Sequence, residues 1–222
     1  PYAKHDAEVV YQYMLNVIGI PKDNIFLLTN DPTRLEIVET LNKINEQKSI
    51  MIQSLDRSDI DVFFYYAGHG TGNNNSIPVL VPYDVSLNNI DAALRRDEDI
   101  MNSLASNTTG KVIGFIDACY ASNSFNVGDR GLGVKTSGSI SENVVVFSAV
   151  SENQKAFPNN PEAHGAFTYQ LLSILKDNQG YINLGQMSTL LIEKVFYSTN
   201  KRQRPSVIYK TTDWKEWKLL SE

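Results

Sequence analysis

Hydrophobic residues recur along the chain at two spacings, and each spacing predicts one kind of element. Apolar residues three and four positions apart predict helices with one buried face, at residues 6–18, 33–48, 90–104, 167–175 and 184–196. Short runs of apolar and β-branched residues predict buried strands, at residues 25–28, 61–66, 79–81, 111–116, 143–148 and 205–209. Because strands alternate with helices, we expect one α/β domain over residues 1–222, with a mostly parallel sheet covered on both faces.

Two segments qualify this pattern. Residues 121–141 are rich in Gly, Ser, Asn and Asp and contain few apolar residues, which is typical of a long mobile loop. The last predicted strand, residues 205–209, begins with Pro and is therefore expected at an edge of the sheet. Such an edge can pair with a second molecule or stay solvated, so the sequence leaves monomer and dimer open.

The composition is that of a soluble globular protein, with 42% hydrophobic and 20% charged residues among 222. The net charge of −5 argues against nucleic acid as a partner, and we interpret the basic residues 201–204 as a solvated loop. No apolar run approaches the roughly 20 residues that cross a bilayer, so no membrane partner is expected. The single cysteine excludes an internal disulfide and argues against a structural zinc site.

Two reactive side chains follow predicted strands. His69 comes shortly after the strand 61–66, and Cys119 comes shortly after the strand 111–116. The carboxyl ends of parallel strands meet at one edge of a sheet, where ligands bind. A thiol and an imidazole placed there predict cysteine nucleophilic catalysis. Taken singly, each residue could instead be packed in the core.

The neighbours of these residues strengthen the prediction. Glycines on both sides of His69 keep the backbone thin where a substrate must approach. The amide groups of Gly70 and Cys119 are candidates to bind an oxyanion. Ser148 ends the next predicted strand, and we expect it to contact the substrate at the same edge.

Asp117 lies two residues before Cys119 and, if the strand extends that far, points to the same side. It could form an acidic wall suited to a cationic side chain. The alternative is a carboxylate at a strand end that binds backbone amides.

The chain resembles the caspase-like cysteine peptidases of clan CD, peptidase family C14. It is more similar to their metacaspase and bacterial orthocaspase branch than to animal caspases. Five segments carry the resemblance: Pro-Tyr-Ala-Lys-His-Asp-Ala at 1–7, Tyr-Ala-Gly-His-Gly at 66–70, Asp-Ala-Cys-Tyr-Ala-Ser at 117–122, the strand at 144–149, and Ala-His-Gly-Ala-Phe-Thr at 163–168. The resemblance implies a three-layer α/β/α sandwich. It also implies a large-subunit-like part at 1–120, a linker at 121–141 and a small-subunit-like part at 142–222.

The resemblance further implies an activity. The family hydrolyses peptide bonds through a thioester, with Cys119 as nucleophile and His69 protonating the leaving amine. Metacaspases carry Asp at the position of Asp117 and cleave after Arg or Lys, whereas animal caspases carry Gln there and cleave after Asp. Asp6 matches a second acidic position of the same pocket, although it could instead cap its helix. We therefore expect protein or peptide substrates with a basic residue before the scissile bond.

The sequence also departs from the family pattern. Ala67 stands where many metacaspases have Ser. Some members need calcium, but the loop after His69 is rich in Asn, Asn126 stands near one aspartate position, and Asp84 and Asp129 are isolated. Because no cluster of hard oxygen ligands is visible, we predict no metal and no cofactor. Calcium activation stays possible without support from the sequence.

The beginning of the chain is a further departure. The family's first strand, which is central in its sheet, precedes the segment that corresponds to residues 2–6. A sheet without it would expose unpaired backbone groups, so we expect an upstream segment to supply that strand. We expect a cytoplasmic protein, while the incomplete amino end leaves a signal peptide open.

The linker 121–141 lies where the family often processes itself, and Arg130 and Lys135 are its basic residues. Both are therefore candidates for autoprocessing, with an uncleaved loop as the alternative. Two other functions remain open: an inactive caspase-like scaffold or regulatory module, and a caspase-like protease that cleaves after Asp.

Overall fold

A central four-stranded sheet organises the computed structural model, which describes residues 2–119, 140–151, 155–159 and 163–220. Its strands lie in the order β1 (Val62–Gly68), β5 (Val112–Ala118), β6 (Val144–Ser148) and β9 (Ser206–Tyr209). The first three are parallel, and β9 is antiparallel to β6. The mostly parallel α/β sheet and the edge position of β9 are thus confirmed.

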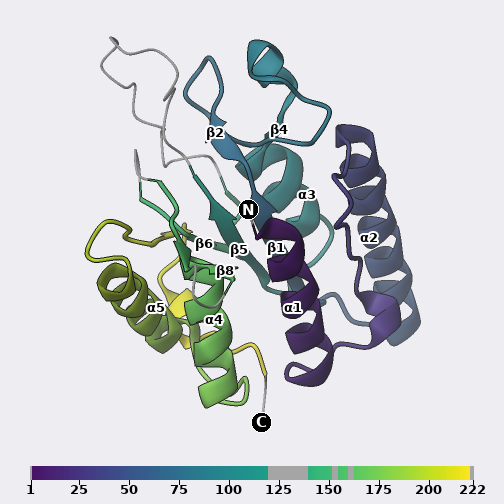
Figure 1. Cartoon of the computed structure of the whole chain (residues 1–222). Coiled ribbons are helices and arrows are strands. Elements are labelled where there is room, and N and C mark those ends of the chain that lie inside the picture. The colour runs from purple at the N-terminus through teal and green to yellow at the C-terminus, as the bar shows by residue number, and fades with distance from the viewer. Residues whose placement is uncertain (1, 120–139, 152–154, 160–162, 221–222) are drawn as a thin grey trace.

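Helices cover both faces of this sheet (Figure 1). Neighbouring residues of a strand point to opposite faces. On β5, Asp117 binds Thr168 of α4 (Ala166–Asp177), whereas a side chain at Gly114 would meet Met101, which precedes α3 (Asn102–Ala105). The helices α4 and α3 therefore lie on opposite faces. Full burial of β5 and β6 agrees with this three-layer arrangement.

The helices begin and end close to the predicted limits, with one extension. Thr33 caps α2 through a capping box with Glu36, and the helix continues seven residues beyond Lys48, to Leu55. The Asp84 carboxylate accepts a hydrogen bond from the backbone amide of Arg34 in the first turn of α2, so Asp84 has a structural role. The α-helices are α1 (Ala3–Asn16), α2 (Arg34–Leu55), α3 (Asn102–Ala105), α4 (Ala166–Asp177) and α5 (Leu184–Ser198).

The predicted helix over residues 90–104 is wrong. The segment instead contains the 3-10 helix η2 (Leu87–Ala92), the strand β4 (Leu94–Arg95), the π-helix η3 (Arg96–Met101) and α3. Ile90 packs in a small cluster with Val79, whereas Leu104 belongs to the main core. Because its apolar residues serve two separate clusters, the segment does not form one continuous helix.

The strand predicted at residues 25–28 is also absent. These residues form no strand, and Phe26, Leu27 and Leu28 are 38–40% exposed. The segment lies across a cavity from β1, and no described strand occupies the space between them. Without a neighbouring strand, the apolar run has no ladder of backbone hydrogen bonds to join.

Short elements complete the described chain. Three of them form a small antiparallel sheet beyond His69, of which the sequence predicted only the middle strand. They are β2 (Gly70–Gly72), β3 (Pro78–Leu80) and β4. The remaining short elements are β7 (Pro158–Asn159), β8 (His164–Gly165) and the 3-10 helices η1 (Lys22–Asn24) and η5 (Asp213–Glu216).

The predicted mobile loop at 121–141 lies almost entirely outside the described residues. Of its last two residues, Ile140 is buried and Ser141 donates to Asn102, so these two pack against the body of the protein.

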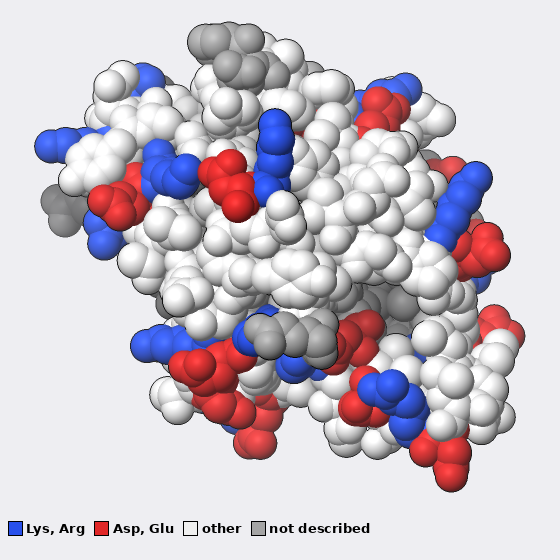
Figure 2. Space-filling view, turned by 90° about the horizontal axis from the view of Figure 1, so that it is seen from below, with Lys and Arg blue, Asp and Glu red and all other residues white. Residues whose placement is uncertain are grey.

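Acidic and basic side chains lie next to one another around the rim of the face in Figure 2, whose centre is mostly uncharged. Lys201, Arg202 and Arg204 are exposed, as predicted for a solvated loop, whereas Gln203 between them is buried. None of the helices in the described part of the chain is both long and apolar enough to cross a membrane.

Candidate active site

The register of the central sheet brings His69 and Cys119 to neighbouring positions. Gly68, the last residue of β1, pairs with Ala118, the last residue of β5. His69 and Cys119 each follow directly, so both lie at the carboxyl edge of the sheet and line the same cavity.

The backbone at His69 is fixed by its surroundings. Its carbonyl oxygen accepts hydrogen bonds from the Tyr66 hydroxyl at 2.8 Å and from the Val81 amide at 2.9 Å. A Cβ atom at Gly68 would lie 2.7 Å from the Tyr66 hydroxyl oxygen, so only glycine leaves room for that bond. The imidazole itself belongs to an exposed residue. Gly70 pairs with Leu80 in the small sheet.

Cys119 is half-buried, and its Sγ accepts a hydrogen bond from the Ala156 amide at 3.2 Å. The next residue, Phe157, donates its amide to Gln203 Oε1 at 2.7 Å, which anchors this segment against the body of the protein. No local sequence pattern indicates this contact, because Ala156 lies 37 residues from Cys119.

Ser148 ends β6 and pairs with Ile116 and Ser206. It is 1% exposed and is not among the residues that line the cavity. Among the described residues, its hydroxyl has no hydrogen-bond partner. Its predicted contact with substrate stays a prediction.

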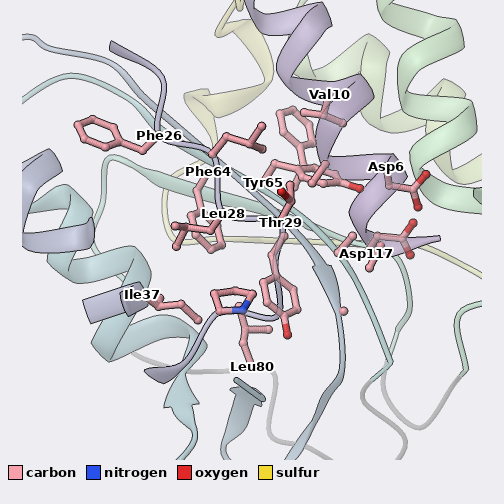
Figure 3. Close-up of a pocket in the computed structure, with 18 of the residues that line it drawn as sticks. Asp6, Val10, Phe26, Leu28, Thr29, Ile37, Phe64, Tyr65, Leu80 and Asp117 are labelled. Atoms are coloured by element: carbon pink, nitrogen blue, oxygen red, sulfur yellow. The ribbon is translucent and has the colours of Figure 1, made fainter. Parts of the chain in front are cut away.

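The two acidic residues lie close together at one end of the cavity (Figure 3). Asp117 remains within β5, so it shares the side of Cys119, and its Oδ2 accepts from the hydroxyl of Thr168 at 2.7 Å and from the amide of Thr168 at 3.2 Å. Asp6 lies in the first turn of α1, but the N-cap is Tyr2 and Asp6 caps nothing. Its carboxylate points to β8 instead.

Gly165 lies between these carboxylates. Its amide donates to Asp6 Oδ2 at 3.0 Å. A Cβ atom at this position would come 2.2 Å from Asp117 Oδ2 and 3.3 Å from Asp6 Oδ2, so any side chain would displace the pair. Gly165 lies in the segment 163–168 that carries the family resemblance, but no sequence pattern marks a role for this residue.

Burial controls the ionisation of both carboxyl groups. Asp117 is 8% exposed, and burial raises its pKa to about 6, against the lowering effect of the hydroxyl of Thr168. Burial also raises the pKa of Asp6 above its usual range, although hydrogen bonds from Gly165 and His164 act in the opposite direction. Shifted carboxyl groups in a cleft are typical of functional sites.

The cavity has a volume of about 860 Å³ and extends from the acidic end into an apolar region. Figure 3 shows Phe26, Leu28 and Ile37 on one side and Phe64 and Leu80 near them. No group of three His, Cys, Asp or Glu side chains in the described residues could hold a metal ion. Asn126, Asp129, Arg130 and Lys135 lie outside the described residues.

Comparison with known proteins agrees with this arrangement. The family model of the caspase domain, peptidase family C14, matches residues 2–214. No curated protein matches the chain. The match spans nearly the whole chain and includes both strand ends, both acidic residues and Gly165. The chain therefore belongs to the caspase-domain family of peptidases.

Proposed function

We propose that this chain is a cysteine endopeptidase of the metacaspase or orthocaspase type that cleaves after Arg or Lys. The observation that carries the proposal is the pair of buried carboxylates, Asp6 and Asp117, which meet at Gly165. They line the same cavity as His69 and Cys119. An acidic pocket favours a cationic side chain and rejects an acidic one.

The proposed reaction has two stages. The thiolate of Cys119 attacks the peptide carbonyl carbon and forms a carbon–sulfur bond. The amides of Gly70 and Cys119 would stabilise the oxyanion. The carbon–nitrogen bond then breaks as the His69 imidazolium protonates the leaving amine. A water molecule, deprotonated by His69, attacks the thioester and releases the carboxylic acid and the thiol.

Fluorogenic peptides that end in Arg, Lys or Asp test this proposal, on the chain and on Cys119→Ala. We expect turnover after Arg and Lys, none after Asp, and none with Cys119→Ala. Turnover after Asp alone would overturn the pocket assignment. Absence of turnover in reducing buffer, with and without calcium, would favour the inactive scaffold.

We also propose that activity needs no metal ion. A chelator such as EDTA tests this in the same assay, where turnover should stay within about twofold. Loss of turnover that calcium restores would contradict it.

Among the described strands, β1 has a neighbour on one side only, which supports the expectation of an additional strand. All seven residues of β1 are only half-buried, whereas β5 and β6 are buried throughout. An apolar strand with an unpaired edge leaves backbone groups unsatisfied. We propose that a segment upstream of residue 1 fills the space between β1 and residues 25–29.

A further inference from the structure

The two acidic residues of the pocket differ in how their oxygen atoms are used. Both oxygens of Asp6 are engaged: Oδ1 lies 2.5 Å from His164 Nδ1, and Oδ2 accepts from the Gly165 amide. Asp117 uses Oδ2 only, and no hydrogen-bond donor in the described residues reaches its Oδ1. Asp117 therefore has an oxygen available for a substrate cation, whereas Asp6 is already committed to a protein partner.

That partner, His164, belongs to β8 and has a side chain that is 13% exposed. From α1, the ring of His5 stacks on it with centroids 4.7 Å apart, and Asp6 binds it. From α4, Tyr169 lies 6.2 Å from it between ring centroids. His164 does not line the cavity itself. Any influence on a substrate must therefore act through Asp6.

We propose that His164 is a positioning residue of the acidic pocket, which holds Asp6 and sets how much negative charge the pocket offers to a substrate cation. The inference rests on the proposed function. When the imidazole is protonated, it balances the charge of Asp6, and Asp117 alone attracts the cation. When the imidazole is neutral, Asp6 adds its charge. The preference for Arg should therefore increase with pH.

Two other groups complicate a simple pH profile. Any pH dependence of the catalytic step is common to both substrates, so comparing two substrates on one enzyme cancels it. Asp117 loses its charge as the pH falls through about 6, and the pKa of Asp6 is raised as well. Replacing His164 by Asn keeps an amide N–H near the position of Nδ1 but removes the charge, so the remaining pH dependence of the preference belongs to the two carboxyl groups.

The experiment measures kcat/KM between pH 5.5 and 8.5 for two peptides that differ only in Arg or its uncharged isostere citrulline. In the wild type, the Arg-to-citrulline ratio should rise with pH. In His164→Asn it should be about tenfold higher than in the wild type at pH 6, as for removal of one neighbouring charge. The two ratios should converge towards pH 8.5, because a histidine ordinarily loses its positive charge over this range and the Asn variant carries none at any pH.

His5→Asn is the matched control, because His5 is an exposed imidazole that stacks on His164 without a hydrogen bond to either carboxylate. The Arg-to-citrulline ratio of His5→Asn should stay within about threefold of the wild-type ratio at each pH. Thermal unfolding verifies folding, and His164→Gln, which also has an uncharged amide, replaces His164→Asn if the latter unfolds.

The outcomes separate the two proposals. Coincident ratios for wild type and His164→Asn, or a ratio that is lower in the variant at every pH, would overturn the role of His164 while leaving the Arg preference intact. A wild-type ratio near one at pH 8.5 would overturn the proposed specificity, and the inference with it.

Discussion

At the scale of single residues, burial determines the chemistry of the pocket. Asp117 and Asp6 are nearly inaccessible, and neither faces a lysine or arginine within the described residues by hydrogen bond or ion pair. A buried carboxylate without a cationic partner destabilises the folded protein when it is ionised. Active sites commonly retain such groups because the substrate supplies the missing charge.

Replacing Asp117 by Asn should therefore stabilise the protein and impair its proposed activity. Folding raises the pKa of Asp117 from 3.8 to about 6. The protonated carboxyl group therefore contributes stability that is complete below about pH 4 and is lost as the pH rises through 6. Above pH 7, Asn should raise the free energy of unfolding by roughly 2–3 kcal/mol. Cleavage after Arg should fall by about two orders of magnitude.

Denaturant unfolding between pH 3 and 8, together with kcat/KM for an Arg peptide, measures both effects. Equal stability of the two proteins at pH 8 would show that Asp117 ionises in the folded protein without cost. Undiminished cleavage would remove Asp117 from the pocket.

Gly165→Ala should damage the pocket directly, because the added Cβ would overlap Asp117 Oδ2. We expect the free energy of unfolding to fall by about 1–3 kcal/mol, as for other overpacked sites. The rate of cleavage after Arg should fall more than the rate at which an alkylating reagent modifies the Cys119 thiol. Gly185→Ala is the matched control. Its Cβ atom would lie 3.0 Å from the nearest atom, Lys215 Cβ, and Gly185 does not line the cavity. Equal kinetics for both variants would contradict the proposed role.

At the scale of elements, the sequence predicted the strands that end at the site better than the segments between them. The runs before His69 and Cys119 are short and rich in apolar and β-branched residues, so the local pattern was sufficient to predict both strands. The prediction of one helix over 90–104 was wrong because its apolar residues, although at helical spacing, pack in two different clusters. The prediction of a strand at 25–28 was wrong because a strand needs a neighbouring strand, which sequence pattern does not reveal.

Autoprocessing in the loop 121–141 is a prediction at this scale. Active wild-type protein should break after Arg130 or Lys135, whereas Cys119→Ala should remain intact because the nucleophile is missing. Mass spectrometry of both proteins after incubation identifies the new ends. The double variant Arg130→Gln/Lys135→Gln should also stay intact, and an intact wild-type chain in active enzyme would refute autoprocessing.

At the scale of the whole molecule, the two ends of the described sheet differ in what lies beside them. On the side of β9, which is half-buried, Trp214 packs edge-on against Phe147. On the side of β1, the half-buried strand faces the cavity and the exposed residues of 25–29. The same cavity reaches the acidic pair, so an additional strand would also close the back of the pocket.

Hydrogen–deuterium exchange of the natural protein tests this strand. If an upstream segment fills the space, peptides covering residues 62–68 should exchange as slowly as those covering 112–118, because both would be paired on two sides. Residues 25–29 should be protected as well. Fast exchange at 62–68 beside slow exchange at 112–118 would show that the edge of β1 is open.

The sequence by itself determined the class of sheet, the placement of His69 and Cys119 at strand ends, and the side on which Asp117 lies, since each follows from local pattern. Tertiary structure alone decided the surroundings of Asp6, whose partner His164 is 158 residues away. It also decided that Gly165 separates the two carboxylates. Contacts between distant segments depend on packing of the whole chain, and burial, which shifts the pKa of both acids, arises only from that packing.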